Sequence, residues 1–296
     1  MKRMNDQQKQ ALGFFNRHAP SWERKVSGSG VKAVNVVKQR NDYVVSVAER
    51  RRATRRALDV GCGTGELACS LGRMGVDARG VDFAANMIDI ARRNARKAGA
   101  SKVSFECASI FDYPLDEGSF DLISANGFIE YISYAELDRF LELARRALSR
   151  GGSLVLGSRN RLFNLFSLNT FTKDELRSGH VPALLEESLA LAGGGLNELA
   201  RVKSIPLQVA GHKHQHTGIG VATRYQFTPA QLVKLLTRKG FRVKEIFPIH
   251  IHGVPPAFKD RHPETHAGVS TLLHRFASES GSLVPFASSF MVHAVK

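Results

Sequence analysis

The sequence predicts an α/β fold, with a mostly parallel sheet of seven strands and helices on both of its faces. Three observations support this prediction. From Ala57 onward, short apolar runs alternate with amphipathic helical segments, as strands alternate with crossover helices in a parallel sheet. A glycine-rich turn separates the first apolar run from the helix that follows it. The chain of 296 residues is long enough for one complete core with additional segments.

Residues 1–56 are predicted to form a helical cap of two or three helices around a break at 27–30, where glycine and serine alternate. Residues 57–296 are predicted to form the main domain. Its strands are expected at 57–60, 78–83, 103–108, 120–126, 152–157, 241–247 and 288–295. Its helices are expected after the glycine turn to about 74, and at 86–98, 135–148 and 228–239. The last of these begins with a hydroxyl N-cap, a proline and a glutamine, at Thr228, Pro229 and Gln231.

Two segments late in the chain interrupt this alternation. Residues 159–224 contain three consecutive glycines and a helical stretch near 183–191, which is typical of a lid inserted over a sheet. Residues 248–282 form a second irregular insertion, with a helix expected near 269–278. A substrate pocket above the carboxyl ends of the strands would be built from such insertions.

The composition excludes several classes of protein. The apolar fraction is 43%, no apolar run approaches the roughly 18 residues of a membrane span, and the first ten residues are polar. Cys62, Cys69 and Cys107 show no C-x-x-C spacing, which argues against a disulfide framework or a cysteine zinc site. We therefore predict a cytoplasmic protein without a membrane span.

The positive charge is concentrated at the N-terminus. The whole chain has 42 Lys and Arg against 27 Asp and Glu, a formal charge of +15. Before Ala57 there are 14 basic and four acidic residues, an excess of ten. Such a surface attracts polyanions or steers an anionic substrate, but it is equally compatible with a solvated helical face.

The strongest chemical signal is the sequence LDVGCGTG at 58–65, between a predicted strand and a predicted helix. Gly61, Gly63 and Gly65 let the backbone turn sharply and approach a ligand, beside the positive end of the following helix. Their spacing differs from the G-x-G-x-x-G of nicotinamide-binding loops. Asp82, near the end of the next strand, can accept hydrogen bonds from both hydroxyls of a ribose. A glycine turn with a ribose-binding acid predicts a nucleoside cofactor.

Four further segments extend the pattern: the acid followed by methionine at 82–87, ASIFDYPL at 108–115, FDLISAN with Phe128 and Glu130 at 120–130, and LSRGG at 148–152. With the glycine turn, they resemble the class I S-adenosylmethionine-dependent methyltransferases, in particular the group that includes the ubiquinone and menaquinone biosynthesis methyltransferases. Ser109 and Arg150 depart from the pattern, standing where an acid and a proline are usual. The resemblance implies a Rossmann-like fold and S-adenosylmethionine as the cofactor.

The resemblance also implies which residues bind that cofactor. They are Asp59, Gly61, Cys62, Gly63, Gly65, Asp82, Phe83, Met87, Ser109, Ile110 and Asn126. Residues 14–22 are similar to the aromatic first helix that closes over the cofactor in such enzymes. Arg17 or Arg24 would then pair with the methionine carboxylate.

Candidates for the acceptor side come from the insertions. Ten of the eleven histidines follow residue 179, and those at 212, 214 and 216, like those at 250 and 252, alternate so that each set shares one face of an extended chain. We predict that His214 or His250 assists proton removal or orients the acceptor. Metal ligation by these sets is the less favoured alternative, and we predict no metal site. Residues 158–169, rich in Phe, Asn and Arg, suit a pocket rim or an ordinary helical lid.

The predicted function is methyl transfer to an oxygen or nitrogen atom of a small polar or anionic molecule by in-line displacement. The alternative is an RNA or DNA methyltransferase that binds nucleic acid through the basic cap. The segment Asn126-Gly127-Phe128 lacks the Asn/Asp-Pro-Pro-aromatic sequence of base-amino methylation, and no cysteine follows a proline as pyrimidine C5 chemistry requires. A third alternative is a cofactor-binding regulator that has lost catalysis.

Overall fold

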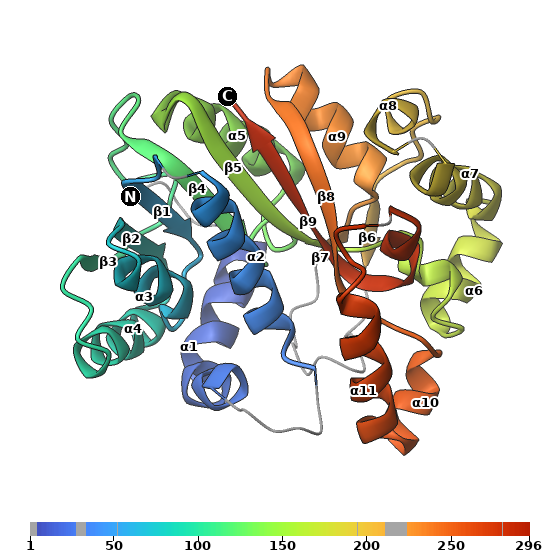
Figure 1. The fold of residues 1–296 in the computed structure, drawn as a ribbon, viewed down its shortest axis with the longest axis horizontal. Helices are drawn as coiled ribbons and strands as arrows, with labels where there is room; N and C mark the ends of the chain where they lie inside the picture. Colours follow the sequence, from blue (N-terminus) through green and yellow to red (C-terminus); the bar gives the residue numbers. More distant parts are fainter. Residues whose placement is uncertain (1–4, 28–33, 52, 194, 211–223, 280) are drawn as a thin grey trace.

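The computed structural model describes the chain apart from residues 1–4, 28–33, 52, 194, 211–223 and 280. Seven strands form one sheet in the order β3-β2-β1-β4-β5-β9-β8 (Figure 1). They are β1 (Arg56–Val60), β2 (Asp77–Asp82), β3 (Val103–Cys107), β4 (Phe120–Asn126), β5 (Leu148–Arg159), β8 (Arg242–Ile251) and β9 (Ala287–Val295). Strands β1 to β5 are parallel to one another, whereas β9 is antiparallel to both β5 and β8. The mostly parallel seven-stranded sheet is therefore confirmed.

Helices connect and cover these strands. The N-terminal region and the first half of the sheet carry α1 (Asp6–Ser27), α2 (Val36–Arg50), α3 (Glu66–Arg73), α4 (Ala85–Lys97) and α5 (Tyr134–Ala147). The second half carries α6 (Thr170–Arg177), α7 (Val181–Gly193), α8 (Gly195–Leu199), α9 (Pro229–Arg238), α10 (Pro256–Arg261) and α11 (Pro263–His274). Short 3-10 helices at Leu162–Leu165 (η1) and Gly281–Phe286 (η2), and the strand pair β6 (Gln208–Ala210) and β7 (Arg224–Gln226), complete the described fold.

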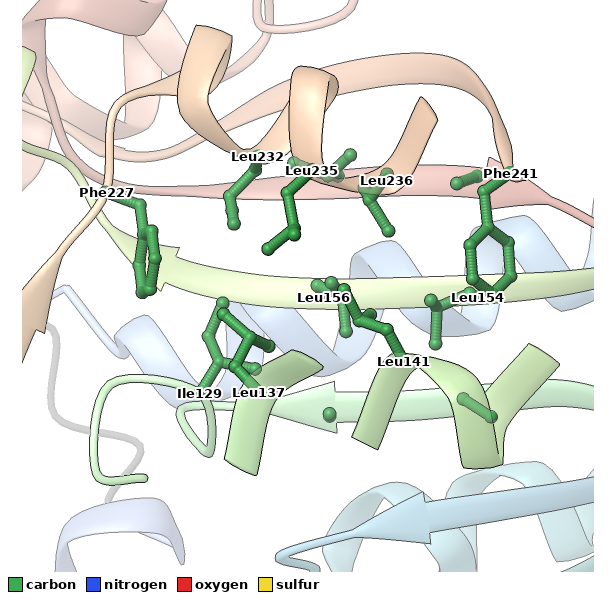
Figure 2. Close-up of a cluster of buried hydrophobic side chains, with 14 of the residues drawn as sticks. Ile129, Leu137, Leu141, Leu154, Leu156, Phe227, Leu232, Leu235, Leu236 and Phe241 are labelled. Carbon is green, nitrogen blue, oxygen red and sulfur yellow. The ribbon is translucent and has the colours of Figure 1, made fainter. Parts of the chain in front are cut away.

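The sheet separates two hydrophobic layers. On one face, Ile123 of β4 and Leu154 and Leu156 of β5 pack among leucines of α5 and α9 (Figure 2). On the other face, Leu122 and Val155 pack among side chains of α2, α3 and α4. Neighbouring positions of one strand thus serve opposite layers, which is why the strands are nearly continuous apolar runs. Helices cover both faces, as predicted.

Local signals in the sequence explain where several helices begin. At α9, the Thr228 hydroxyl accepts from the Gln231 backbone N–H, and the Gln231 side chain accepts in return from the Thr228 N–H, with Pro229 at the first helical position. This confirms the predicted helix start. Ser133 and Glu136 form the same reciprocal pair at α5. Each cap satisfies backbone donors that the helix cannot pair itself.

The N-terminal region consists of two helices in its described part, as predicted. Helix α1 packs against α4, and α2 packs against α3 and β8. In Figure 1 both helices lie between α3 and α4 on one side and α10 and α11 on the other. Division of the chain into a cap at 1–56 and a main domain at 57–296 stays a prediction.

Several boundaries differ from the prediction. Strand β5 begins at Leu148, because the turn at 148–152 already pairs with Phe120 before a register shift. Strand β8 continues to Ile251, four residues beyond the predicted strand, because β9 offers it a partner along that whole length. Helix α11 begins at Pro263 rather than near 269, and α10 was not predicted.

None of the helices in the described ranges is long and apolar enough to span a membrane.

Candidate functional site

The turn between β1 and α3 is shaped by its glycines. Gly61, Gly63 and Gly65 have φ angles of 69°, 52° and 85°, a region that side chains disfavour. The Gly61 N–H donates to the Val81 carbonyl at 2.8 Å, which ties the turn to β2. A Cβ atom on Gly63 would lie 3.7 Å from Nε1 of Trp22, so α1 covers the turn. Both Gly61 and Gly63 line the cavity described below, Gly63 beneath Trp22 and Gly61 beside Phe128, which would lie 3.4 Å from a Cβ atom there.

The third glycine serves packing instead. A Cβ atom on Gly65 would lie 2.7 Å from the Phe105 ring and 2.9 Å from the Ala91 side chain. Cys62 is also buried on this inner side, where its sulfur would lie 2.9 Å from a Cβ atom on Gly80. Gly65 and Cys62 thus let the turn sit tightly on the sheet, and neither borders the cavity described below.

Asp82 connects the turn to the end of β2. Its carboxylate accepts from the Gly63 N–H at 3.0 Å and from the Ala84 N–H at 2.9 Å. Burial raises the pKa of Asp82, while these backbone donors act in the opposite direction. Asp59 lies in β1, away from the cavity lining; burial, and then the nearby carboxylates of Asp82 and Glu66, raise its pKa well above the usual value.

A cavity of about 640 Å³ extends from the glycine turn to the histidines of β8. The predicted cofactor residues that line it are Gly61, Gly63, Asp82, Phe83, Met87, Ser109, Ile110 and Asn126. All but Met87, which lies in α4, come from the ends of β1, β2 and β4 and the segment after β3, where the carboxyl ends of parallel strands meet. Asp59, Cys62 and Gly65 do not line it. The roles of all these residues stay predictions.

Asn126 offers a polar atom to a ligand. Its Nδ2 donates to Oδ1 of Asn41 at 3.3 Å, but its own Oδ1 is buried without a hydrogen-bond partner among the described residues. A buried acceptor left without a donor is costly and uncommon. A ligand N–H placed in this part of the cavity would satisfy it. Together with the open glycine backbone and the Asp82 carboxylate, this fits a nucleoside carrying an amino-acid group.

A pair of arginines that line the cavity shares one carboxylate. Nε of Arg159 donates to Glu130 at 2.7 Å, and the Arg40 guanidinium lies 3.5 Å from the other Glu130 oxygen and donates to Ser289 at 2.9 Å. All three charged side chains are largely buried. Burial lowers the pKa of Arg40, and its Nε lacks a hydrogen-bond partner in the described structure. Two positive charges against one negative charge leave the site ready for an anionic ligand group.

Sequence reasoning did not identify Arg40, although a signal existed. Arg40 stands on the apolar stripe of α2, between Val36 and Val37 on one side and Tyr43 and Val44 on the other, with no acid three or four residues away. A charged residue on the buried face of an amphipathic helix needs a partner from elsewhere. That partner is Glu130, 90 residues later.

The other end of the cavity is rich in amide and aromatic side chains. From the predicted rim at 158–169, the lining residues are Arg159, Asn160, Phe163, Asn164, Ser167 and Asn169. Arg161 differs from the prediction because it is fully buried and forms a two-point ion pair with Glu175 of α6, at 2.8 and 2.9 Å. It therefore fixes the lid-like segment on the sheet rather than facing a ligand.

The predicted catalytic and carboxylate-binding residues lie in different places. His250 lines the cavity and is only 5% exposed. His214 lies outside the described residues. Arg17 donates to the Gly13 carbonyl within its own helix and does not line the cavity, whereas Arg24 does. These assignments stay predictions, but Arg40 is placed more favourably for a carboxylate than Arg17.

Comparison with known proteins agrees with the cofactor end of the cavity. Residues 57–152 match a family model described as a methyltransferase domain. The ubiquinone biosynthesis O-methyltransferase of Azorhizobium caulinodans is 30% identical over 164 residues, which cover 52% of this chain and 64% of that protein. That of Nitrobacter winogradskyi is 34% identical over 113 residues, 38% of this chain and 42% of that protein. Over residues 57–152 the chain is therefore similar to the class I S-adenosylmethionine-dependent methyltransferases.

Solved structures agree with the fold of the chain. Magnesium protoporphyrin IX methyltransferase from Synechocystis PCC 6803, solved with bound S-adenosylhomocysteine, aligns with a TM-score of 0.57 at 16% identity, covering 98% of this chain and 100% of that chain. The 1,6-didemethyltoxoflavin-N1-methyltransferase of Burkholderia thailandensis aligns with a TM-score of 0.57 at 11% identity, covering 100% and 92%. A domain of this family takes S-adenosylmethionine as its cofactor.

The match has a clear limit. The chain spans 64% and 42% of the length of the two curated relatives, and the family model ends at residue 152. The histidines of β8 and α11 and the rim at 158–169 lie beyond that point. The family model therefore covers the glycine turn and Asp82 but not the acceptor end of the cavity.

Proposed function

We propose that this chain is an S-adenosylmethionine-dependent methyltransferase that transfers a methyl group to an oxygen or nitrogen atom of a small polar or anionic molecule. The observation that supports the proposal is the single cavity that joins the glycine turn and Asp82 to the polar rim and His250. In-line displacement needs both reactants in one water-excluding space. A volume of about 640 Å³ lies within the range of small-molecule sites.

The cofactor end supplies binding and orientation. When bound, S-adenosylmethionine supplies a methyl group already activated by its positive sulfur, so catalysis consists chiefly of alignment. Asp82 accepts from the ribose hydroxyls, and Oδ1 of Asn126 accepts from the ammonium group. Met87 and Ile110, both buried and both lining the cavity, pack on the adenosine.

Arg40 holds the methionine carboxylate in this proposal. Its guanidinium has an unpaired Nε, and one Nη atom lies 2.9 Å from the position of a Cβ on Gly127, next to Asn126. A carboxylate there would complete the charge balance of Arg40, Arg159 and Glu130. The ion pair would be charge-assisted and buried, which is the strong form of this contact.

His250 orients the acceptor in this proposal. Its Nδ1 lies 3.2 Å from the Ser288 hydroxyl and its Nε2 lies 2.9 Å from Nε2 of His266. Because both ring nitrogens already have neighbours within hydrogen-bonding distance, His250 holds a fixed ring position. Phe163 and Asn164 border the same space, one apolar and one polar, as a small polar acceptor requires.

The basic N-terminal region gives less support to a nucleic-acid substrate. Arg40 faces Glu130 in the cavity, Arg50 pairs with Glu245 at 2.9 Å, and Arg51 donates to the Gly151 carbonyl. These three side chains connect α2 to the rest of the fold. Methylation of a nucleic acid is therefore not part of the proposal, and the test below would detect it.

The test uses purified protein, radiolabelled S-adenosylmethionine and cell extract, with the Asp82→Asn variant as a control for background transfer. The labelled products are separated into small-molecule, lipid or polysaccharide, protein and nucleic-acid fractions, with and without nuclease. We expect nuclease-resistant label in the small-molecule fraction, absent with the variant. Nuclease-sensitive label would overturn the small-molecule acceptor. If the protein binds S-adenosylhomocysteine but labels no fraction, the chain is a cofactor-binding protein without this activity.

A further inference from the structure

Three buried histidines meet at the acceptor end of the cavity. His250 and His252 belong to β8 and the residue after it, and His266 belongs to α11. They are 5%, 7% and 2% exposed. Their ring centroids lie 4.2, 4.6 and 5.1 Å apart. One nitrogen from each ring lies within 4.8 Å of one nitrogen of both others.

The backbone at His250 is turned to make this cluster. His250 has a φ of 55°, and among the described residues only Leu168 shares a positive φ without being glycine. The His250 N–H donates to the Gln39 side chain at 2.8 Å, which holds the turn from α2. Such strained residues persist where the surroundings fix them, and they concentrate at functional sites. Here the turn brings the His250 and His252 rings together.

We propose that His250, His252 and His266 bind one zinc-class divalent metal ion, with an open coordination position facing the cavity. Three histidine nitrogens with a fourth position left for a water or substrate oxygen are a recurring catalytic zinc arrangement. Two nitrogens on one tetrahedral zinc stand about 3.3 Å apart, given Zn–N distances of about 2.0–2.1 Å. The two facing Nε2 atoms of His250 and His266 are 2.9 Å apart, close to that separation.

The chemistry of the cluster selects the class of ion. Ligation requires neutral imidazoles, and all three rings are buried, which disfavours their charged form. The charged neighbour that acts on both rings is Lys259, a cation that repels metal ions. Hard ions such as Mg²⁺ prefer oxygen ligands, whereas imidazole suits zinc, copper, nickel and iron. The site therefore favours an ion that gains strongly from nitrogen ligands.

The open coordination position of the metal suggests which chemical group the acceptor carries. His250 and His252 line the cavity, so a metal held by them faces the space where the proposed function puts the acceptor. An acceptor with a hydroxyl, carbonyl or carboxylate oxygen would bind the ion through that oxygen. Only this last step depends on the proposed function; metal binding itself depends on the three histidines alone.

The test uses untagged full-length protein that has been treated with a chelator and dialysed. Zn²⁺ binding is measured in competition with a chromophoric chelator, and Co²⁺ is added separately to record its visible absorption. We expect one ion per chain and the absorption of a nitrogen-bound, four- or five-coordinate cobalt. We expect His252→Ala and His266→Ala each to weaken Zn²⁺ binding at least about 100-fold, since outer-shell changes alone cost about 10- to 100-fold.

His274→Ala is the matched control, because His274 lies in the same helix as His266 but outside the cluster. It should bind Zn²⁺ as the original chain does. Stoichiometric binding that survives in the His252→Ala, His266→Ala double variant would overturn the assignment, as would the lack of binding by the unaltered protein. S-adenosylhomocysteine binding is measured on the same samples, so that a failure of the cofactor proposal or of folding is seen separately.

Discussion

The two ends of the cavity are built in different ways. At the cofactor end, the lining includes the backbone of the glycine turn and Asp82 of the next strand, and the Gly63 N–H donates a hydrogen bond to Asp82. At the acceptor end, the surface is made by side chains from distant segments, held in place by buried ion pairs and hydrogen bonds such as Arg161–Glu175. The shape of a site built from backbone is set by a few short motifs. The shape of a site built from side chains is set by the ion pairs and hydrogen bonds that hold those side chains. The two ends should therefore respond differently to substitution.

The largest expected effect is the loss of stability at the acceptor end. Arg161→Met leaves the buried Glu175 carboxylate without its arginine, beside only the Asn164 amide and His180, so we expect the free energy of unfolding to fall by about 3–5 kcal/mol. Urea denaturation measures this. Adding Glu175→Met should restore part of the loss, because no unpaired charge then remains. Arg201→Met, which breaks the exposed pair with Glu198, should change stability by less than about 1 kcal/mol. Equal effects of Arg161→Met and Arg201→Met on stability would show that the buried ion pair matters no more than the exposed one.

At the cofactor end, a side-chain change should affect binding instead of folding. Asp82→Asn removes a charge from the proposed ribose contact, and each hydrogen bond to a charged group is worth about 1.5–3 kcal/mol. We expect S-adenosylhomocysteine to bind about 100-fold more weakly by calorimetry, with zinc binding unchanged. Asp77→Asn, at the exposed opposite end of β2, serves as the control. Equal binding by both variants would mean that Asp82 only supports the turn.

A smaller effect is expected for the contact between Arg40 and the carboxylate of the cofactor. If Arg40 holds the methionine carboxylate, Arg40→Met should weaken S-adenosylhomocysteine binding about tenfold and leave methylthioadenosine binding unchanged, because that compound lacks the carboxylate. Arg17→Met should affect neither compound, since Arg17 donates to the Gly13 carbonyl outside the cavity. The reverse result would restore Arg17 as the carboxylate partner.

The smallest expected effect lies in the sheet, away from both ends. Burial lowers the pKa of His293 to about 4, although Glu245 opposes this, and Ser153 lies 3.0 Å from its Nε2. The unfolded chain therefore takes up this proton first, so the stability contribution falls as pH drops from about 6.5 to about 4. For a partly exposed ring we expect about 1 kcal/mol. In urea denaturation, His293→Gln should reduce the fall in the free energy of unfolding over this pH range. An unchanged fall would mean that other groups cause it.

The strands and helices were predictable because each depends on local chemistry. Hydrophobic alternation gave the seven strands, and the cap at Thr228 gave the start of α9. The end of β8 was not predictable, because residues 248–251 are strand only through pairing with β9, whose position in the sheet no local pattern reveals.

The same reasoning explains which residues of the candidate site could be predicted from the sequence. Glycines could be found by spacing, but spacing does not distinguish Gly63, which faces the cavity, from Gly65, which accommodates Phe105. Arg40 and Glu130 are 90 residues apart, and no periodicity connects them. His250 and His252 were recognised as a pair by alternation, but His266 joins them only through the packing of α11 against β8.

The place of β9 in the sheet has a consequence for biosynthesis. Strand β9 pairs with β5 on one side and β8 on the other, yet it follows both in the chain. During translation, β1 to β5 can assemble while β5 still presents an unpaired edge, and β8 has no partner in the sheet until residues 287–295 emerge. Open edges of this kind recruit other chains. The nascent protein therefore passes through a period of exposure to aggregation that ends only when β9 inserts.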